Sequence, residues 1–312
     1  MAERLNLYQL IARNRARTMF FIVLFSLMLG VIGYGLGWYF RWGVGIYVLF
    51  GLGIVFYNVI LYFNSDKLAL AVSGARAADP NEFYVLHNVV EEVAIAAGIP
   101  KPAVYVMNED APNAFATGRD PKHASIAVTA GLLETMNREE LQGVIAHEMS
   151  HIRNYDILVM TVVAMIGGLI ILFRDIFLRW GLFGGGGRRN RDSRGGGQLG
   201  LILVLVGIAL AIVSPLLVAL IRAAVSRQRE YLADASGALI IRNPNGLSSA
   251  LRKLQSYEGK LRTASNVTAH MFIANPYGKD RRTVADLFAT HPPLPDRISR
   301  LEGLTIPESE QG

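Results

Sequence analysis

Four long uncharged stretches dominate the pattern of hydrophobic and polar positions along the chain. They cover residues 18–40, 42–63, 157–173 and 199–221, and they are 23, 22, 17 and 23 residues long. A helix that crosses about 30 Å of hydrocarbon needs about 20 residues. The first, second and fourth stretches are long enough for this, and the third is marginal. We therefore expect four hydrophobic helices, each transmembrane or membrane-associated.

The remaining segments carry the mixed pattern of a folded domain. Apolar residues at helical spacing in 80–98 predict a helix, whereas 103–107 and 124–130 have the composition of strands. Asn137 followed by Glu140 is a capping-box signal, so another helix should begin near Arg138. The predicted fold class is α+β, a mainly helical domain with a short β-sheet, joined to the four hydrophobic helices.

This pattern divides the chain into four parts. Residues 1–63 form an N-terminal transmembrane hairpin, 64–156 the first half of the domain, 157–221 a second hydrophobic hairpin, and 222–312 the second half of the domain. Residues 184–197 in the second hairpin are rich in Gly and Arg, so we expect a flexible loop there. The first stretch is too long for a cleaved signal peptide and a second follows at once, which favours an uncleaved anchor.

Basic residues indicate the orientation and the kind of partner. Arg13, Arg15 and Arg17 precede the first stretch, whereas the short turn after it carries only Arg41. Lys and Arg favour the cytoplasmic ends of membrane spans, so the N-terminus and both halves of the domain should be cytoplasmic. The arginines behind the net charge of +6 cluster beside apolar stretches. We therefore expect the lipid bilayer, and no nucleic acid, as a partner.

Composition limits the available chemistry. With 52% hydrophobic and 18% charged residues, the chain differs from an ordinary soluble protein. It contains no cysteine, which excludes disulfides, thiolate metal sites and cysteine nucleophiles. Any metal ion must therefore be held by histidine and carboxylate side chains.

The segment HEMSH, residues 147–151, carries a metal-binding pattern. His147 and His151 lie on one face of a helix about one turn apart, so both imidazoles can bind one ion. Glu148 is placed to accept a proton from a metal-activated water. This HExxH pattern is typical of zinc metallopeptidases and predicts a hydrolase with one Zn²⁺ per subunit. We expect the helix to continue past Asp156 into the third apolar stretch, with Asp156 at the membrane boundary.

A catalytic zinc ion usually has three protein ligands, so the second half of the domain should supply one more. In the segment REYLADASG, residues 229–237, Glu230 and Asp234 are one helical turn apart. Glu230 is the candidate ligand, and Asp234 is a candidate to accept a hydrogen bond from the far nitrogen of a ligand histidine. The alternative is a solvated helix face, which the neighbouring Arg227 and Arg229 would also fit.

Five motifs together resemble the HtpX family of integral-membrane gluzincin metallopeptidases. They are PNAFATG (112–118), IAVTAGLL (126–133), HEMSH, REYLADASG and THPPLPDRI (290–298). The resemblance implies a gluzincin-like domain with His147, His151 and Glu230 as zinc ligands, Glu148 as general base and Asp234 orienting a ligand. It also implies a multi-pass endopeptidase of the inner or plasma membrane with a cytoplasmic active site. Its substrates would be unfolded or damaged membrane proteins, in quality control and the stress response.

Two further roles have candidate residues. The oxyanion formed during hydrolysis needs a second electrophile, for which His291 is the candidate and Arg297 the alternative. A purely structural role for His291 in a turn stays open. An extended substrate can add to an exposed strand edge. We expect residues 125–129, including Ser125 and Val128, to form this edge, with 113–118, beginning at Asn113, as its rim. Arg297 is a further candidate at the substrate edge, and an interior strand without substrate contact is the alternative.

Topology and function each leave alternatives. His151 and Glu230 must reach the same ion, so the chain between them crosses the membrane twice or not at all. The rival functions are a prenyl-dependent CAAX peptidase, a four-span transporter or scaffold, and an inactive relative that acts as an adaptor. No apolar stretch contains an ionisable residue, which argues against transport, and every catalytic residue type is present, which argues against an inactive chain. The sequence does not predict an oligomeric state.

Overall fold

The computed structural model describes residues 7–183, 204, 206–208, 227–263, 269–277 and 292–304. The loop predicted at 184–197 and almost all of the fourth apolar stretch lie outside these residues. The described part is mostly helical with a small sheet, which agrees with the predicted α+β class. Its elements in chain order are α1 (Leu7–Tyr39), α2 (Val44–Val72), β1 (Ala75–Ala77), α3 (Tyr84–Ala97), β2 (Ala103–Met107), β3 (Ala114–Asp120), β4 (His123–Thr129), α4 (Ala130–Thr135), α5 (Arg138–Arg153), α6 (Asp156–Phe183), α8 (Arg227–Ile241), α9 (Pro244–Ser256), the 3-10 helix η1 (Ala269–Met271) and α11 (Leu294–Glu302).

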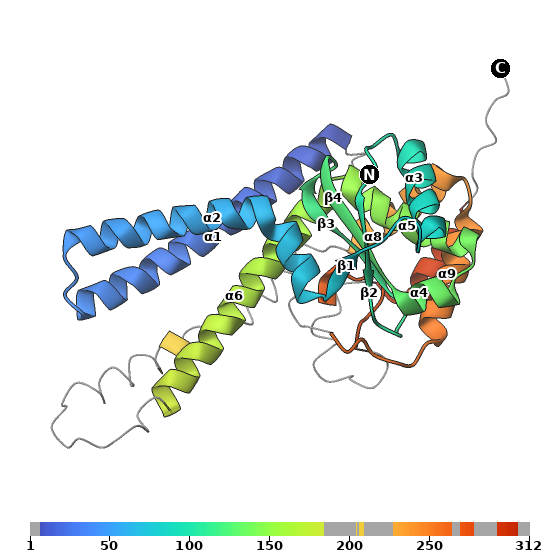
Figure 1. Ribbon diagram of the computed structural model, residues 1–312. Helices are drawn as coiled ribbons and strands as arrows, with labels where there is room; N and C mark the ends of the chain where they lie inside the picture. The colour runs from blue at the N-terminus through green and yellow to red at the C-terminus, as the bar shows by residue number, and fades with distance from the viewer. Residues whose placement is uncertain are drawn as a thin grey trace.

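The four strands form a mixed sheet with helices on both faces (Figure 1). Its order is β1-β2-β4-β3, with β2 and β4 parallel and the other two pairs antiparallel. Successive residues of a strand point to opposite faces. Ile126 and Val128 lie in a buried cluster that includes residues of α3, α5 and α9, whereas Ala127 lies in a cluster with residues of α1, α2 and α6. The sheet therefore separates the helices of the HEMSH side from those of the N-terminal hairpin.

This strand order contradicts one prediction. Strand β4, which contains Ser125 and Val128, lies between β2 and β3 and is hydrogen-bonded on both sides. Residues 125–129 are therefore an interior strand, and the prediction that they form the substrate edge is wrong. The edge next to β4 is β3, which Asn113 precedes.

Helix α5 places HEMSH in the interior. It begins at Arg138 as predicted, because the Asn137 side chain accepts a hydrogen bond from the Glu140 N–H while the Glu140 side chain accepts one from the Asn137 N–H. Helix α8 packs closely against it. A Cβ atom at Gly237 would lie 2.9 Å from the backbone nitrogen of His147, so a glycine is needed for this approach. The close packing brings the helix that carries Glu230 against the helix that carries the two histidines.

Helices α1 and α2 form the N-terminal hairpin. Among the described residues, they are the two helices long and apolar enough to cross a membrane, over Ala12–Tyr39 and Val44–Val72. Large apolar side chains such as Leu27, Val31 and Phe56 are exposed on their surfaces, as expected for contact with lipid. Figure 1 shows α1, α2 and α6 extending from one side of the body that holds the sheet and α5.

The third apolar stretch lies in α6, but α6 does not continue α5. Helix α5 ends at Arg153, Tyr155 has a positive φ of 60°, and α6 begins at Asp156. The predicted continuous helix is therefore wrong, because a tight turn separates the two helices. Asp156 lies in the protein interior with 3% of its surface exposed, so it does not mark the boundary with lipid.

The first turns of α6 are also interior. Ile157 and Val162 are fully buried, and the Thr161 hydroxyl shares a hydrogen bond of 3.0 Å with the hydroxyl of Thr117 in β3. This part of the apolar stretch packs on the sheet rather than facing lipid. Within the described residues, the first two of the four predicted hydrophobic helices are candidate membrane spans, and the fourth lies almost entirely outside these residues.

Candidate metal centre

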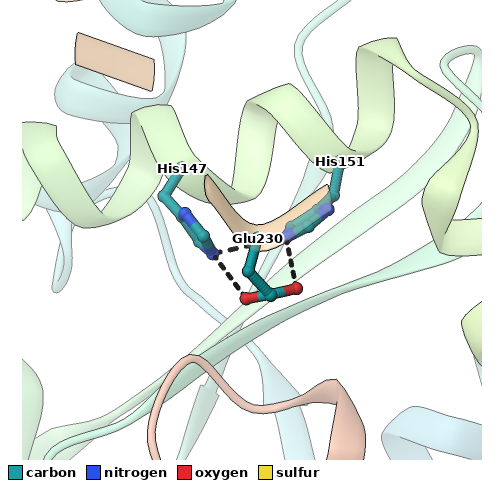
Figure 2. Close-up of side chains that lie close together, drawn as sticks. All are labelled: His147, His151 and Glu230. Carbon is teal, nitrogen blue, oxygen red and sulfur yellow. Dashed lines mark hydrogen bonds and ion pairs between the residues drawn. The ribbon is translucent and has the colours of Figure 1, made fainter. Parts of the chain in front are cut away.

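Two histidines of α5 and one glutamate of α8 converge at one point (Figure 2). The His147 and His151 Nε2 atoms are 3.3 Å apart. The Glu230 carboxylate lies 3.8 Å from His147 Nε2 through Oε2 and 3.5 Å from His151 Nε2 through Oε1. Ligands held at about 2.0–2.1 Å in a tetrahedron lie roughly 3.3–3.4 Å apart, so this donor set fits a zinc ion with one position left open. All three side chains are buried.

A carboxylate holds the other nitrogen of each histidine. Asp234 Oδ1 lies 2.9 Å from His147 Nδ1, and Asp156 Oδ2 lies 3.2 Å from His151 Nδ1. With Nδ1–H donating to a carboxylate, Nε2 keeps its lone pair for a metal ion. The structure thus places Asp234 where the sequence suggested. Asp156 makes the same kind of contact with His151, which was not predicted from the sequence. The sequence signal for it is Asn154, a residue type that often ends a helix, because a helix that ends there allows Asp156 to turn back toward His151.

The two imidazoles have different electrostatic surroundings. Burial and the charge of Arg297 lower the pKa of His147 to about 4. Burial also lowers the pKa of His151, but the hydrogen bond to Asp156 and the charge of Glu230 outweigh it and raise this pKa to about 9. His147 is therefore neutral near pH 7, whereas His151 must release a proton when its Nε2 binds a metal ion.

Glu148 lies between α5 and the edge strand. It is 2% exposed, and the backbone N–H of Ala116 in β3 donates a hydrogen bond to its carboxylate. Burial raises the pKa of Glu148 to about 7, and the charge of Glu230 acts in the same direction. A carboxylate with this pKa can both accept and return a proton near neutral pH.

Arg297 lies behind His147, not at a substrate edge. This residue of α11 is fully buried and binds the Asp234 carboxylate through Nε at 2.8 Å and Nη2 at 2.6 Å. Its Nη1 donates to the Ile273 carbonyl at 3.0 Å, and its Nη2 lies 3.3 Å from His147 Nδ1. The prediction that placed Arg297 at the substrate edge is therefore wrong. Burial would raise the pKa of Asp234, but Arg297 lowers it to about 2, so the pair stays charged.

The other predicted site residues have different outcomes. His291 lies outside the described residues. Asn113 is buried at the start of β3, where its side chain donates to the Ala274 carbonyl at 3.0 Å and accepts from the Ala274 N–H at 3.3 Å. The Ile273 N–H donates to the carbonyl of Ala114 at 3.0 Å. The residues after η1 therefore already occupy the β3 edge at Ala114.

Comparisons with known proteins find relatives over almost the whole chain. The family model described as Peptidase family M48 matches residues 80–305. A protease HtpX homolog of Caldanaerobacter subterraneus is 62% identical over 96% of this chain and 98% of that protein. Homologs with the same description from Thermoanaerobacter pseudethanolicus and Dictyoglomus thermophilum are 58% and 43% identical, over 97% and 94% of this chain and 100% and 93% of theirs. The crystal structure of S. mikatae Ste24p is similar over 95% of this chain and 67% of that one, at 16% identity and a TM-score of 0.48.

Proposed function

The chain belongs to peptidase family M48 and is a metalloprotease related to the HtpX proteases, and from this premise we propose that it is a membrane-anchored zinc endopeptidase. The observation that carries the proposal is the convergence of His147, His151 and Glu230, with Glu148 beside them. Two histidines and a glutamate with a fourth position open form the donor set of a catalytic zinc site. We further propose that the substrates are misfolded or damaged membrane proteins and that the role is quality control.

The residues of the site would divide the work of hydrolysis. His147, His151 and Glu230 would hold the ion, which when bound supplies Lewis-acid polarisation of the scissile carbonyl and acidifies a water molecule. Glu148 takes the proton of that water on its carboxylate and passes it to the nitrogen of the leaving amine. Its pKa of about 7 suits both transfers. His291 is proposed to stabilise the oxyanion, because the Arg297 guanidinium is engaged with Asp234.

The substrate chain is proposed to lie along the part of the β3 edge beyond Ala114, because the Ile273 N–H already pairs with the Ala114 carbonyl. Ala116 of this strand donates its N–H to Glu148, so the edge runs directly past the proposed general base. Backbone pairing with a strand edge binds an extended peptide with little demand on its sequence. This suits a protease that acts on many damaged proteins.

The membrane anchor is proposed to be the α1–α2 hairpin, with the active site on the cytoplasmic side of the cell membrane. The support is the exposed apolar surface of both helices and the three arginines at the start of α1, which favour a cytoplasmic N-terminus. The start of α1 lies at the end of the hairpin next to the body that holds the sheet and α5 (Figure 1), and Arg15 near this start lies over the Tyr155 ring of the α5–α6 turn. The catalytic site would then lie close to the membrane surface, where damaged spans emerge.

A Glu148→Gln variant tests the proposed chemistry. The full-length protein in detergent is incubated with casein and with a denatured membrane protein, and its zinc content is measured on the same sample. We expect zinc to remain bound while cleavage falls about 10²–10⁴-fold, since general acid–base catalysis contributes on that order. The matched control is Glu139→Gln, which removes the same charge from an exposed position of the same helix.

Two outcomes would contradict the proposal. Cleavage by Glu148→Gln at the rate of the control would remove Glu148 from the chemistry. If the wild-type protein cleaves a prenylated CAAX peptide but neither protein substrate, the chain is a prenyl-dependent CAAX peptidase instead.

A further inference from the structure

A buried hydrogen-bond chain connects the first membrane helix to the metal centre. Asn14 of α1 donates its Nδ2–H to Asp156 Oδ1 at 2.8 Å and to the Asn154 carbonyl at 3.0 Å. The other oxygen of Asp156 lies 3.2 Å from His151 Nδ1. Asn14, Asn154 and Asp156 are 3%, 8% and 3% exposed, so bulk water does not replace these contacts. Only one residue, Asp156, separates the Asn14 amide from a candidate zinc ligand.

The two acceptors of Asn14 flank the turn between α5 and α6. Asn154 follows the last residue of α5, Tyr155 adopts φ 60°, and Asp156 opens α6. A tyrosine with positive φ is uncommon and needs surrounding contacts to hold it. Arg15, also of α1, lies over the Tyr155 ring at 4.9 Å from its centroid. Helix α1 therefore contacts all three residues of the turn, Asn154, Tyr155 and Asp156. The turn places Asp156 next to His151.

The opposite end of the Asn14 amide contacts the helix of the third ligand. Arg229, the neighbour of Glu230 in α8, places Nη1 at 3.4 Å from Asn14 Oδ1 and at 3.3 Å from Asp156 Oδ1. These partners fix the orientation of the amide, since its oxygen faces a guanidinium and its nitrogen faces a carboxylate. Asn14 thus joins α1, the α5–α6 turn and α8, which are the elements around His151 and Glu230.

We propose that Asn14 is a positioning residue for the metal centre, holding Asp156 in place so that His151 presents Nε2 to the ion. This inference rests on the proposed function, because it assumes that His151 binds zinc. It gives the N-terminal hairpin a second task beside anchoring, since α1 supplies part of the support for a ligand. Losing the support of a ligand histidine typically lowers metal affinity 10–100-fold.

The first test measures zinc affinity of the full-length protein in detergent by competition with a chromogenic chelator, and the visible spectrum of the Co²⁺-substituted protein. Asn14→Ala should weaken zinc binding by about tenfold or more and alter the Co²⁺ bands. The matched control is Thr18→Val, one turn further along α1. Thr18 is equally buried, and its hydroxyl donates to the Asn14 carbonyl within the helix, so its replacement should leave both measurements unchanged.

A second test exchanges the two side chains, as Asn14→Asp with Asp156→Asn, and it applies even if Asn14→Ala does not fold. Asn14→Asp sets two carboxylates against each other, and Asp156→Asn removes the charge that faces His151. Their combination restores a donor and an acceptor between the two positions. The double variant should therefore bind zinc more tightly than Asn14→Asp alone.

The results separate the inference from the proposed function. Wild-type affinity and an unchanged Co²⁺ spectrum in Asn14→Ala, or a double variant no tighter than Asn14→Asp, overturns the positioning role alone. A wild-type protein that takes up no zinc overturns the proposed function and the inference together. Weaker binding in Asn14→Ala, with rescue in the swapped pair and none of this in Thr18→Val, supports the positioning role.

Discussion

Glu140 ties the start of the catalytic helix to α9, and its replacement by glutamine should destabilise the protein. Its buried carboxylate accepts hydrogen bonds from the Asn137 N–H at 2.9 Å, the Ser249 hydroxyl at 2.7 Å and the Lys253 ammonium at 2.6 Å. A glutamine retains one acceptor oxygen in place of two and faces one of these donors with an N–H. At least one charge-assisted bond is lost, and each contributes about 1.5–3 kcal/mol.

We therefore expect Glu140→Gln to lower the free energy of unfolding by about 2–3 kcal/mol near neutral pH, since Lys253 and Ser249 of α9 lose their charged acceptor. For a folded unit of this size the loss corresponds to a drop of roughly 5–10 °C in the unfolding midpoint. The assay is thermal unfolding of the detergent-solubilised protein, followed by the circular dichroism of its helices. Glu139→Gln, in the same first turn but exposed, is the control and should shift stability by no more than about 0.5 kcal/mol.

The effect should also depend on pH. Burial raises the pKa of Glu140, but the hydrogen bonds from Lys253, Ser249 and Asn137 outweigh it and hold this pKa below 4.5. A carboxyl whose pKa is depressed by folding stabilises the protein above its unfolded pKa, and that stability is lost as the pH falls through the folded value. The difference between wild type and Glu140→Gln should therefore shrink below pH 4.5. Equal midpoints for Glu140→Gln and Glu139→Gln near neutral pH would refute the reasoning.

Three further predictions concern the site and the membrane. Arg297→Met removes the cationic partner of the buried Asp234 carboxylate and should lower the free energy of unfolding by about 3–5 kcal/mol in chemical denaturation; a loss under about 1 kcal/mol contradicts the ion-paired geometry. Asp234→Asn should weaken zinc binding about 10–100-fold in chelator competition, because His147 loses a charged acceptor, and unchanged affinity contradicts that role. Since the chain has no cysteine, Gly43→Cys in the α1–α2 turn should react with an impermeant maleimide in intact cells, and the exposed Asn88→Cys only after lysis. The reverse pattern contradicts the proposed orientation.

Local signals in the sequence predicted much of the catalytic side. The start of α5 at Arg138 follows from Asn137 and Glu140, because a capping box acts over four adjacent residues. The spacing of His147 and His151 follows from the helix repeat alone. Placing Glu230 beside them needed chemistry as well as pattern, namely the expectation that zinc takes a third protein ligand.

Predictions that depend on tertiary arrangement were less successful. The order of strands is not encoded in the alternation of any one strand, and the prediction that β4 forms an edge is wrong for this reason. Its nearly continuous apolar run from Ala124 to Val128 is nevertheless typical of a strand buried on both faces. The third apolar stretch shows a related limit: its first turns pack against β3, and burial in protein and burial in lipid favour the same residues.

Asn14 had no local signal at all. It lies between Arg13 and Arg15 in a segment that reads as the basic flank of a membrane helix. Its partners Asp156 and Arg229 are far away in the sequence, and only the packing of α1 beside α6 brings them together. Contacts of this range follow from the fold and not from the pattern.

The central claim is that His147, His151 and Glu230 hold one zinc ion. Zinc-edge X-ray absorption of the full-length protein in detergent tests it most directly, with Glu230→Gln as the companion sample. We predict a wild-type spectrum of two imidazoles with oxygen ligands at about 2.0–2.1 Å, and one zinc ion per chain. The Glu230→Gln sample should lose an oxygen ligand or lose the metal. A wild-type spectrum without imidazole, or one that Glu230→Gln leaves unchanged, would contradict the claim.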